Sequence, residues 1–355
     1  MDFELIPIMK PRLPRIEKVT PYLQSMDERC IYSNNGHLLK TLEQRFAEVL
    51  HVNKSNVVLC ANATLGLQGL CQLSPAHEFK IPSFTFAATG LIAQKSGKPF
   101  ILLDIHPESW EIDISQIKPD SSVGVVTVAP FGKSLEINKY ENISNLIVDA
   151  AASLGYYMQN PVKLNMNQSF VFSLHATKVL GIGEGGIAVF GDPEKANEFR
   201  SWINFGFSGS RDSKILGTNA KMSEMQAAYG HAVLDNWEIE KKEWLIARKK
   251  ANQVESDFPE LFNHNLEMDV SPYWLSYSNP ELKVEIVKIF KKLNIETRDW
   301  WSRGLHNMPA FSKYNDKHFP ITEKVADSSI GLPFFREMKD SDFDRIHEAL
   351  SKVDR

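Results

Sequence analysis

Short, largely apolar runs recur between residues 57 and 190, separated by turn residues and by stretches with a helical pattern. The runs are rich in Val, Ile, Leu and Phe, and few polar residues interrupt them. Such runs predict strands that are buried on both faces, which is typical of a mostly parallel sheet covered by helices. The seven predicted strands are 57–60, 79–81, 100–103, 123–128, 146–148, 170–173 and 187–190.

Only a Gly-rich loop separates the last two predicted strands, so they are expected to be close neighbours in the sheet. Helical patterns lie between the earlier strands, where they predict crossover helices, and they dominate the chain beyond Phe190. One of the later helices is long and rich in Glu/Lys pairs. The expected helices are 64–73, 87–95, 223–233, 236–254 and 340–352.

The change of pattern after Phe190 predicts two domains. A chain of 355 residues is long enough for a large and a smaller domain. The irregular stretch at 259–270 is expected to mark the passage between them. We therefore predict an α/β fold with an N-terminal segment and large domain over residues 1–250, and a small α+β C-terminal domain over 251–355.

Composition excludes several classes of protein. The formal net charge of −4 argues against nucleic-acid binding, which needs a basic face. No apolar run approaches the ~20 residues of a membrane span, and no signal peptide is recognisable. The histidines and the three cysteines show no spacing typical of a metal site. An odd number of cysteines suits the reducing cytoplasm, with buried, inert thiols as the default interpretation.

A single lysine lies in the Gly-rich loop that follows the strand predicted at 170–173. The loop begins Ser173-Leu174-His175-Ala176-Thr177-Lys178 and contains Gly183-Glu184-Gly185-Gly186. Loops at the carboxyl end of a parallel sheet are where α/β folds place their chemistry. A lysine that is screened from water there can lose its proton and act as a nucleophile, whereas most lysines are simply exposed on the surface.

This loop resembles the cofactor-binding signature of the DegT-type sugar-nucleotide aminotransferases, which are fold-type-I enzymes that use pyridoxal 5'-phosphate (PLP). The resemblance extends over nearly the whole chain, in blocks that keep the family's order. It implies a PLP-dependent transaminase in which Lys178 holds the cofactor as a Schiff base and moves protons during catalysis. The further blocks are Asn35-Gly36, Leu42-Glu43, Asn62-Ala63-Thr64, 82–89, Asp149-Ala150-Ala151, 217–224, Leu305-His306 and Leu332-Pro333.

The resemblance implies that Asp149 neutralises the ring nitrogen of PLP. Asp149 ends an apolar strand, where a carboxylate is costly unless it is paired. From local sequence alone, a helix N-cap is an equally good explanation, and only the presence of Lys178 favours the cofactor role.

The resemblance assigns the cofactor's phosphate to Asn62, Ala63, Thr64 and Ser173. The first three open a helix, whose positive end attracts anions, although helix capping alone would explain the same residue types.

Two more residues gain a role only from the resemblance. Phe86 would stack on the ring of PLP, although an aromatic residue in such a turn is more often part of the core. Asn219 would reach the phosphate in the neighbouring subunit, although it would otherwise be taken for a helix cap. The resemblance therefore implies a homodimer with shared active sites.

Three positions depart from the family pattern. Ala152 stands where the family commonly has a glutamine that bonds the cofactor's ring oxygen, and Ser153 is the candidate substitute. The sequence Asn219-Ala220-Lys221 replaces the family's Asn-Tyr-Arg, and the loop 205–216 has no counterpart in the pattern. Trp301, His306 and Lys221 are the candidate substrate contacts, with core packing or a structural role as the simpler alternative for the first two.

Three other functions are alternatives to a transaminase. Residues 181–186 satisfy the dinucleotide pattern GxGxxG, but they precede a predicted strand rather than a helix, which argues against a nicotinamide dehydrogenase. A PLP-dependent sugar dehydratase would carry histidine in place of Lys178. A non-catalytic regulatory protein on the same fold would have no need of both Lys178 and Asp149.

The expected reaction is the transfer of an amino group from L-glutamate to a nucleotide-linked keto-deoxysugar. A dTDP-4-keto-6-deoxyhexose is the best candidate. The product would serve the biosynthesis of surface polysaccharide, such as the O-antigen of lipopolysaccharide, or of a glycoside, and the enzyme would work in the cytoplasm.

Overall fold

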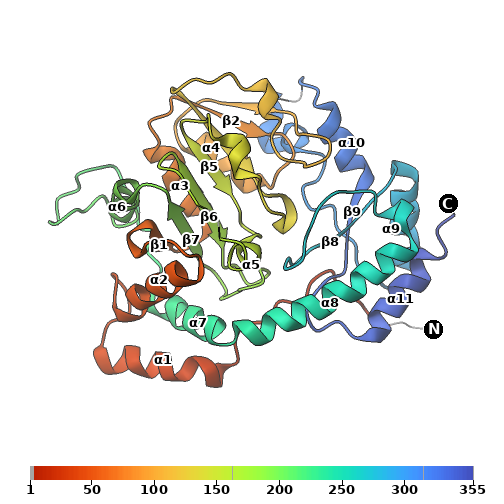
Figure 1. Ribbon diagram of the computed structural model, residues 1–355, viewed down its shortest axis with the longest axis horizontal. Helices are drawn as coiled ribbons and strands as arrows, with labels where there is room; N and C mark the ends of the chain where they lie inside the picture. The colour runs from red at the N-terminus through yellow and green to blue at the C-terminus, as the bar shows by residue number, and fades with distance from the viewer. Residues whose placement is uncertain (1–3, 162, 315, 355) are drawn as a thin grey trace.

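A seven-stranded sheet forms the centre of the molecule (Figure 1). The computed structural model describes residues 4–161, 163–314 and 316–354. Its strands are β1 (Val57–Cys60), β2 (Glu78–Pro82), β3 (Phe100–Leu103), β4 (Val123–Val128), β5 (Leu146–Asp149), β6 (Gln168–Ser173) and β7 (Gly186–Phe190). They lie in the order β1-β7-β6-β5-β4-β2-β3. Strand β7 runs antiparallel to both of its neighbours, and the other neighbouring pairs of this sheet are parallel. The predicted mostly parallel sheet and the pairing of its last two strands are confirmed.

Both faces of the sheet are buried, which explains why its strands read as continuous apolar runs. Alternate side chains of β1 enter two separate cores: Val57 and Leu59 enter one, and Val58 and Cys60 enter the other. Helices α2 (His37–Val49) and α7 (Glu224–Asp235) contribute to the first core. Helices α3 (Ala63–Leu73), α4 (Ala87–Lys95) and α6 (Pro193–Trp202) contribute to the second.

A smaller α+β C-terminal domain completes the fold, as predicted. Strands β8 (Trp274–Tyr277) and β9 (Ser329–Leu332) form an antiparallel pair. The long helix α8 (Trp237–Asp257) extends from the large sheet to this pair (Figure 1), so the boundary that we propose at residue 250 lies inside a helix. The other helices of this domain are α9 (Pro280–Lys292), α10 (Pro320–Ser328) and α11 (Asp340–Leu350).

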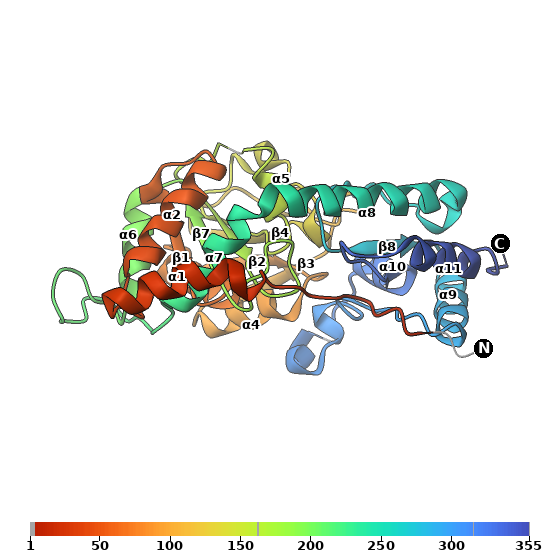
Figure 2. The same cartoon turned by 90° about the horizontal axis from the view of Figure 1, so that it is seen from below.

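The first described residues lie against the C-terminal domain rather than the large sheet. Ile6 pairs with Ile295 in a parallel bridge, and the N–H of Phe334 donates to the carbonyl of Ile8 at 3.1 Å. The chain then crosses to helix α1 (Ile16–Arg29), which packs against α7 (Figure 2). The N-terminal segment therefore links the two parts of the molecule.

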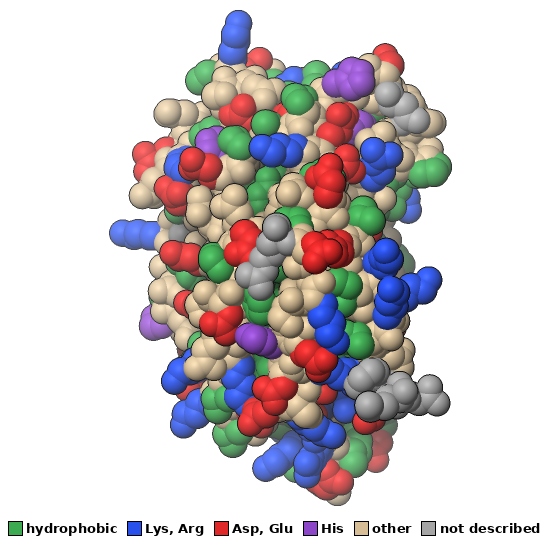
Figure 3. Space-filling model, turned by 90° about the vertical axis from the view of Figure 1, so that its right-hand side faces the viewer, with side chains coloured by type: hydrophobic (Ala, Val, Ile, Leu, Met, Phe, Trp, Pro, Cys, Tyr) green, Lys and Arg blue, Asp and Glu red, His purple; other side chains and the backbone are tan. Residues whose placement is uncertain are grey.

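The surface carries charge of both signs. On the side of the molecule seen in Figure 3, Lys and Arg side chains are interspersed with Asp and Glu. No helix in the described part of the chain is both long and apolar enough to cross a membrane. Among the free cysteines, Cys60 and Cys71 are buried, and burial raises the pKa of each thiol to about 12. Cys30 is exposed at the end of α1, so the expectation of buried thiols is wrong for that residue.

Candidate active site

A cavity of about 570 Å³ opens where the parallel strands of the large sheet end. The chain enters its wall just after β1 at Asn62 and just after β2 at Phe86, while β5 and β6 reach it with their last residues, Asp149 and Ser173. The C-terminal domain contributes the opposite wall, which includes Tyr273. Because the carboxyl ends of parallel strands meet at one edge, residues far apart in sequence converge on this cavity. Of the predicted site residues, those that line it are Lys178, Asp149, Asn62, Ala63, Thr64, Phe86, Ser173 and Trp301.

Lys178 lies in a loop whose conformation is held by hydrogen bonds between its own backbone groups. The N–H of Ala176 donates to the carbonyl of Gly183 at 2.9 Å, and the N–H of Lys178 donates to the carbonyl of His175 at 2.8 Å. Gly183 has a φ of +101°, and a side chain at Gly181 would meet the backbone of Ala176 at 2.6 Å. Only glycine suits these two positions. The fixed loop carries the Lys178 amine to the cavity, where Nζ donates to the Tyr273 hydroxyl at 2.7 Å.

Asp149 is a buried carboxylate that has no cationic partner within ion-pair distance among the described residues. Thr89 Oγ1 donates to Oδ2 at 2.9 Å, and the N–H of Ala151 donates to Oδ1 at 3.2 Å. Burial raises the pKa of Asp149, while the hydrogen bonds from Thr89 and Ala151 and the charge of Lys178 oppose this rise. The next helix, α5 (Leu154–Tyr157), begins five residues later, so Asp149 is not its N-cap.

The start of α3 faces the same cavity and can hold an anion. The Asn62 side chain caps this helix by accepting from the N–H of Leu65 at 2.9 Å, so the capping alternative is confirmed for Asn62. The first N–H groups of a helix have no acceptor within it, and the first two residues of α3, Ala63 and Thr64, line the cavity. Ser173 Oγ accepts from the N–H of His175 at 3.1 Å, which leaves its own hydrogen free to donate to a phosphate oxygen.

Phe86 leaves 58% of its surface exposed, although it is a large apolar residue. It lies at the N-cap position of α4 and lines the cavity. Phe84, two residues earlier, is instead buried between Trp110 and Trp301. The alternative that Phe86 is a core residue is therefore wrong, and its exposed ring is available to a flat ligand.

Four predicted site residues do not line the cavity of their own subunit. Ser153 is fully buried, and its hydroxyl donates to the carbonyl of Lys133 at 3.0 Å, away from the cavity. His306 is also buried, and its Nε2 lies 3.2 Å from a Glu323 carboxylate oxygen.

The other two of these residues, Asn219 and Lys221, lie on the segment that runs beside the edge strand β1. The carbonyl of Ala220 accepts from the N–H of Ala61 at 2.8 Å, which holds this segment against the end of β1. Lys221 Nζ donates to Asn219 Oδ1 at 2.6 Å and lies 4.4 Å from the centroid of the Phe205 ring. The backbone hydrogen bond of Ala220 places this segment next to the end of β1, which Asn62 follows. Neither Asn219 nor Lys221 lines the cavity of this subunit.

The structure adds residues to the site that the sequence did not indicate. Tyr273 and Arg298 come from the C-terminal domain, and Phe131 follows β4; all three line the cavity. The guanidinium of Arg298 lies 5.2 Å from the Trp300 ring and has no carboxylate partner among the described residues. Thr89, which hydrogen-bonds to Asp149, lies one helical turn beyond Phe86, and it belongs to the block 82–89 that carries part of the resemblance.

Two alternative chemistries receive no support. Residues 181–186, which match the dinucleotide pattern, lead into strand β7 and not into a helix. The part of the chain that the structure describes contains no group of three or more His, Cys, Asp or Glu residues that could hold a metal ion.

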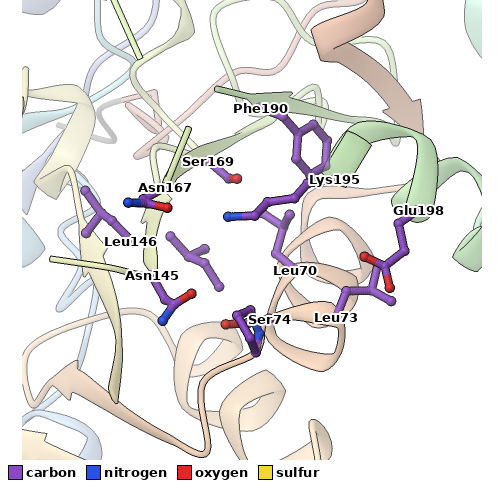
Figure 4. Close-up of a pocket in the computed structure, with 12 residues that line it drawn as sticks. Leu70, Leu73, Ser74, Asn145, Leu146, Asn167, Ser169, Phe190, Lys195 and Glu198 are labelled. Carbon is purple, nitrogen blue, oxygen red and sulfur yellow. The ribbon is translucent and has the colours of Figure 1, made fainter. Parts of the chain in front are cut away.

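A second, much smaller cavity of about 40 Å³ lies at the other end of the strands (Figure 4). Asn145 and Asn167, which precede β5 and β6, line it together with Lys195 from α6. It therefore lies at the amino ends of these strands, whereas Asp149 and Ser173 lie at their carboxyl ends. Its size is close to that of a single water molecule's share of liquid volume, so it is no rival to the large cavity.

Comparisons with known proteins agree with this geometry. The model of the DegT/DnrJ/EryC1/StrS aminotransferase family matches residues 15–351. The dTDP-4-amino-4,6-dideoxy-D-glucose transaminase of Escherichia coli is 25% identical, over 96% of this chain and 96% of its own. The GDP-perosamine synthase of Caulobacter vibrioides is 24% identical, over 99% of each chain. The crystal structure of DesI in the presence of its TDP-sugar product matches with a TM-score of 0.85 and 26% identity, over 99% of this chain and 93% of its own.

Proposed function

This chain belongs to the DegT/DnrJ/EryC1/StrS aminotransferase family, and we propose that it transfers an amino group from L-glutamate to a nucleotide-linked keto-deoxysugar. It is a PLP-dependent sugar aminotransferase. A dTDP-4-keto-6-deoxyhexose is the best candidate acceptor, because a dTDP-aminosugar transaminase and a TDP-sugar complex are among the similar proteins.

One observation carries the proposal: a single cavity holds both an amine and a buried carboxylate that has no cationic partner within ion-pair distance in the described part of the chain. Lys178 supplies the amine from the loop after β6, and Asp149 supplies the carboxylate from the end of β5. A buried carboxylate is costly unless a positive group faces it. The protonated ring nitrogen of PLP is such a group, so the cavity fits the cofactor better than it fits water.

The remaining walls fit the other parts of PLP. Lys178 would hold the cofactor covalently, and Asp149 would keep its ring nitrogen protonated. The start of α3, at Ala63 and Thr64, would bind the phosphate together with the Ser173 hydroxyl. Phe86 would cover one face of the ring. When bound, PLP supplies an electron sink that stabilises negative charge on the α-carbon of the amino donor.

Lys178 has a second task once its amine is released by the amino donor. The freed Nζ would then take the proton from the donor's α-carbon as a base and give it up again as an acid. Asp149 would keep its charge during this transfer, because the positive ring nitrogen of bound PLP would face it. Trp301 and Phe131, whose rings stack at 4.1 Å, close one side of the cavity and limit the entry of water to the amine.

Both proposed substrates are anions, and the cavity offers a cation for them. Arg298 lines the wall of the C-terminal domain with its guanidinium over Trp300. A planar guanidinium suits the oxygens of a carboxylate or of a diphosphate. Trp301 is proposed to pack against the sugar. We keep His306 and Lys221 as proposed substrate contacts that would need either a movement of the buried histidine or a second subunit.

A homodimer would bring Asn219 to a neighbouring active site. The segment between α6 and α7 projects from the body of the subunit (Figures 1 and 2). It carries exposed apolar side chains, among them Phe205 at 46% and Leu216 at 96% exposure. Exposed apolar residues of this size are typical of surfaces that another protein covers. We propose that a second copy covers them and receives Asn219 beside its phosphate site.

The proposed setting is the cytoplasm, because the three free cysteines suit a reducing compartment. The aminated sugar would then enter surface polysaccharide, such as the O-antigen of lipopolysaccharide, or a glycoside.

The substrate proposal is tested with the PLP-loaded protein, L-glutamate and a panel of sugar nucleotides. The panel contains 3-keto and 4-keto sugars on dTDP, UDP and GDP, and mass spectrometry detects the aminated product together with 2-oxoglutarate. We expect the highest kcat/KM with a dTDP-4-keto-6-deoxyhexose, and no product from the Lys178→Ala variant. Turnover of L-glutamate without amination of any sugar nucleotide would refute the acceptor, while the family membership would stand.

A further inference from the structure

The amine of Lys178 makes its side-chain hydrogen bond to a residue on the opposite side of the cavity. Tyr273 Oη lies 2.7 Å from Lys178 Nζ. Tyr273 immediately precedes β8 in the C-terminal domain, whereas Lys178 follows β6 in the large sheet. This contact therefore joins the two parts of the molecule at the reactive atom.

The position of the Tyr273 hydroxyl is fixed by the groups around it. Phe131 and Trp300 both pack edge-on against the ring, with centroid distances of 5.5 and 5.0 Å. The backbone is held as well: its N–H donates to the Ser271 hydroxyl at 3.2 Å, and the buried Arg248 donates to its carbonyl. The hydroxyl can therefore rotate its hydrogen but cannot leave the amine without a movement of the domain wall.

The neighbouring residues on the β5 side offer no comparable group. Ala152 lines the cavity with a methyl group, and Ser153 is turned away toward the carbonyl of Lys133. Besides Tyr273, the charged and titratable side chains that share the cavity with Lys178 are Lys95, in the last turn of α4, and four residues that have other neighbours. Asp149 is bonded to Thr89, His175 to Thr177, and Arg298 lies over Trp300, while Glu184 lies 3.8 Å from His175.

We propose that Tyr273 is the positioning residue for Lys178. Its hydroxyl holds the free amine in the cavity, and it hydrogen-bonds the linking nitrogen and the adjacent ring oxygen when Lys178 is joined to PLP. The ring hydroxyl of PLP is on the ring carbon next to the one that carries the aldehyde group, and lysine binds that aldehyde carbon. A group that contacts the lysine nitrogen can therefore also reach the ring oxygen. This inference rests on the proposed function, because it needs PLP at Lys178.

A phenol is a better hydrogen-bond donor than acceptor, so it stabilises the electron-rich forms of its partners. With Tyr273 in place, the linked nitrogen and ring oxygen should therefore release their shared proton at a lower pH. The absorbance of lysine-bound PLP in the near-visible range reports this proton directly. The prediction can thus be measured without turnover.

The test compares Tyr273→Phe with Tyr277→Phe. The first removes the hydroxyl and keeps the ring that packs against Phe131 and Trp300. The second removes a hydroxyl from the same β8 region, where the ring packs at 5.1 Å against Trp110, away from Lys178. We expect the pH midpoint of the absorbance change to rise by about one unit in Tyr273→Phe and to stay unchanged in Tyr277→Phe, since one hydrogen bond to an ionised group is lost.

Steady-state kinetics give a second readout. For Tyr273→Phe, we expect kcat to fall by roughly ten- to a hundred-fold with little change in the KM of the sugar nucleotide, because the hydroxyl acts on Lys178. Thermal unfolding and borohydride trapping of PLP on Lys178 are measured for each protein. A titration of Tyr273→Phe that coincides with the unsubstituted enzyme, moves down, or matches that of Tyr277→Phe overturns the inference. Failure to trap PLP on Lys178 of the unsubstituted enzyme overturns the proposed function instead.

Discussion

Asp149 gives the sharpest prediction for the chemistry, and the change that isolates it is Asp149→Asn. The substitution keeps the size of the side chain and one oxygen, but it removes the negative charge. In the structure, this carboxylate is buried and receives two neutral hydrogen bonds, from Thr89 and from the N–H of Ala151. The ring nitrogen of bound PLP is then its only proposed cationic partner, so the substitution acts mainly on that nitrogen.

The expected loss follows from the burial of the pair. Breaking a buried ion pair by removing one partner costs about 3–5 kcal/mol. Each 1.36 kcal/mol is ten-fold in rate, so kcat should fall by roughly two to four orders of magnitude. PLP should still attach to Lys178, since the lysine and the phosphate site are unchanged. Steady-state assays with L-glutamate measure the loss, and the near-visible absorbance confirms that the cofactor is bound.

Although Asp149→Asn should lower kcat, it should make the apoprotein more stable than the unsubstituted apoprotein as pH rises. Burial raises the pKa of Asp149 above its ordinary value of 3.8, so the folded protein holds this proton more tightly than the unfolded chain. The free-energy cost of burying the ionised carboxylate therefore appears as the pH rises from the ordinary pKa of 3.8 through the raised pKa of the folded state. Over that range, the apoprotein should lose stability relative to Asp149→Asn, and urea unfolding at several pH values measures the difference.

PLP should remove this cost, because its ring nitrogen supplies the missing positive partner. With PLP bound, the unsubstituted enzyme should therefore no longer lose stability relative to Asp149→Asn as the pH rises over this range. An Asp149→Asn enzyme that keeps a kcat within a factor of about three of the original, a loss far below one broken buried pair, would refute the reasoning. So would an apoprotein whose stability relative to the variant is independent of pH.

Two further predictions concern the ring of Phe86 in the cavity wall and the hydrogen bonds of Glu224 to the start of α2. Phe86→Ala should weaken PLP binding roughly ten-fold through lost ring stacking and leave the apoprotein's stability nearly unchanged, whereas the buried Phe84→Ala should cost about 3–5 kcal/mol of unfolding free energy. Equilibrium dialysis measures PLP binding, and urea unfolding measures the stability of both variants. Equal losses of stability in Phe86→Ala and Phe84→Ala would contradict the assignment of Phe86 to the cavity wall and of Phe84 to the core. Glu224 accepts from the N–H groups of Leu38 and Leu39 at the start of α2, so Glu224→Gln should cost about 2 kcal/mol, while the exposed Glu238→Gln should cost little. Similar urea midpoints for these two variants would argue against a stabilising role of the Glu224 carboxylate at the start of α2.

The sequence predicted the large sheet well, because its strands are buried on both faces and read as uninterrupted apolar runs. Strands β1, β3 and β4 match the predicted ranges, and the expected helices correspond to α3, α4, α7, α8 and α11 with ends within three residues. Helix ends were set by local signals, such as the Ser223 cap of α7. The pairing of β8 with β9 was not predicted, since these strands are short and lie more than 50 residues apart.

The site was predicted as far as its residues follow strands of the large sheet. Asp149 and Ser173 end strands of the sheet, and Phe86 and Lys178 lie within five residues of a strand end, where their position can be inferred from the sequence. Tyr273 and Arg298 could not be found in this way, because they enter the cavity from a domain whose position depends on tertiary packing.

Ser153 shows the limit of inference by proximity in sequence. It lies four residues after Asp149 and was the candidate to replace the missing glutamine beside the ring oxygen. In the structure, the turn directs its hydroxyl to the carbonyl of Lys133, and the hydroxyl that contacts Lys178 belongs to Tyr273. Side-chain direction in such a turn depends on the backbone of the folded state, which residue order does not specify.

Trapping PLP on its lysine tests the proposed role of Lys178 without any assay of turnover. The PLP-loaded protein is reduced with borohydride, digested and mapped by mass spectrometry, with Lys178→Arg as the control. We expect one pyridoxyl group on the peptide that contains Lys178, and none on the same peptide of the control. A reduced protein without this adduct, or with the adduct on another lysine, would contradict the assignment of Lys178.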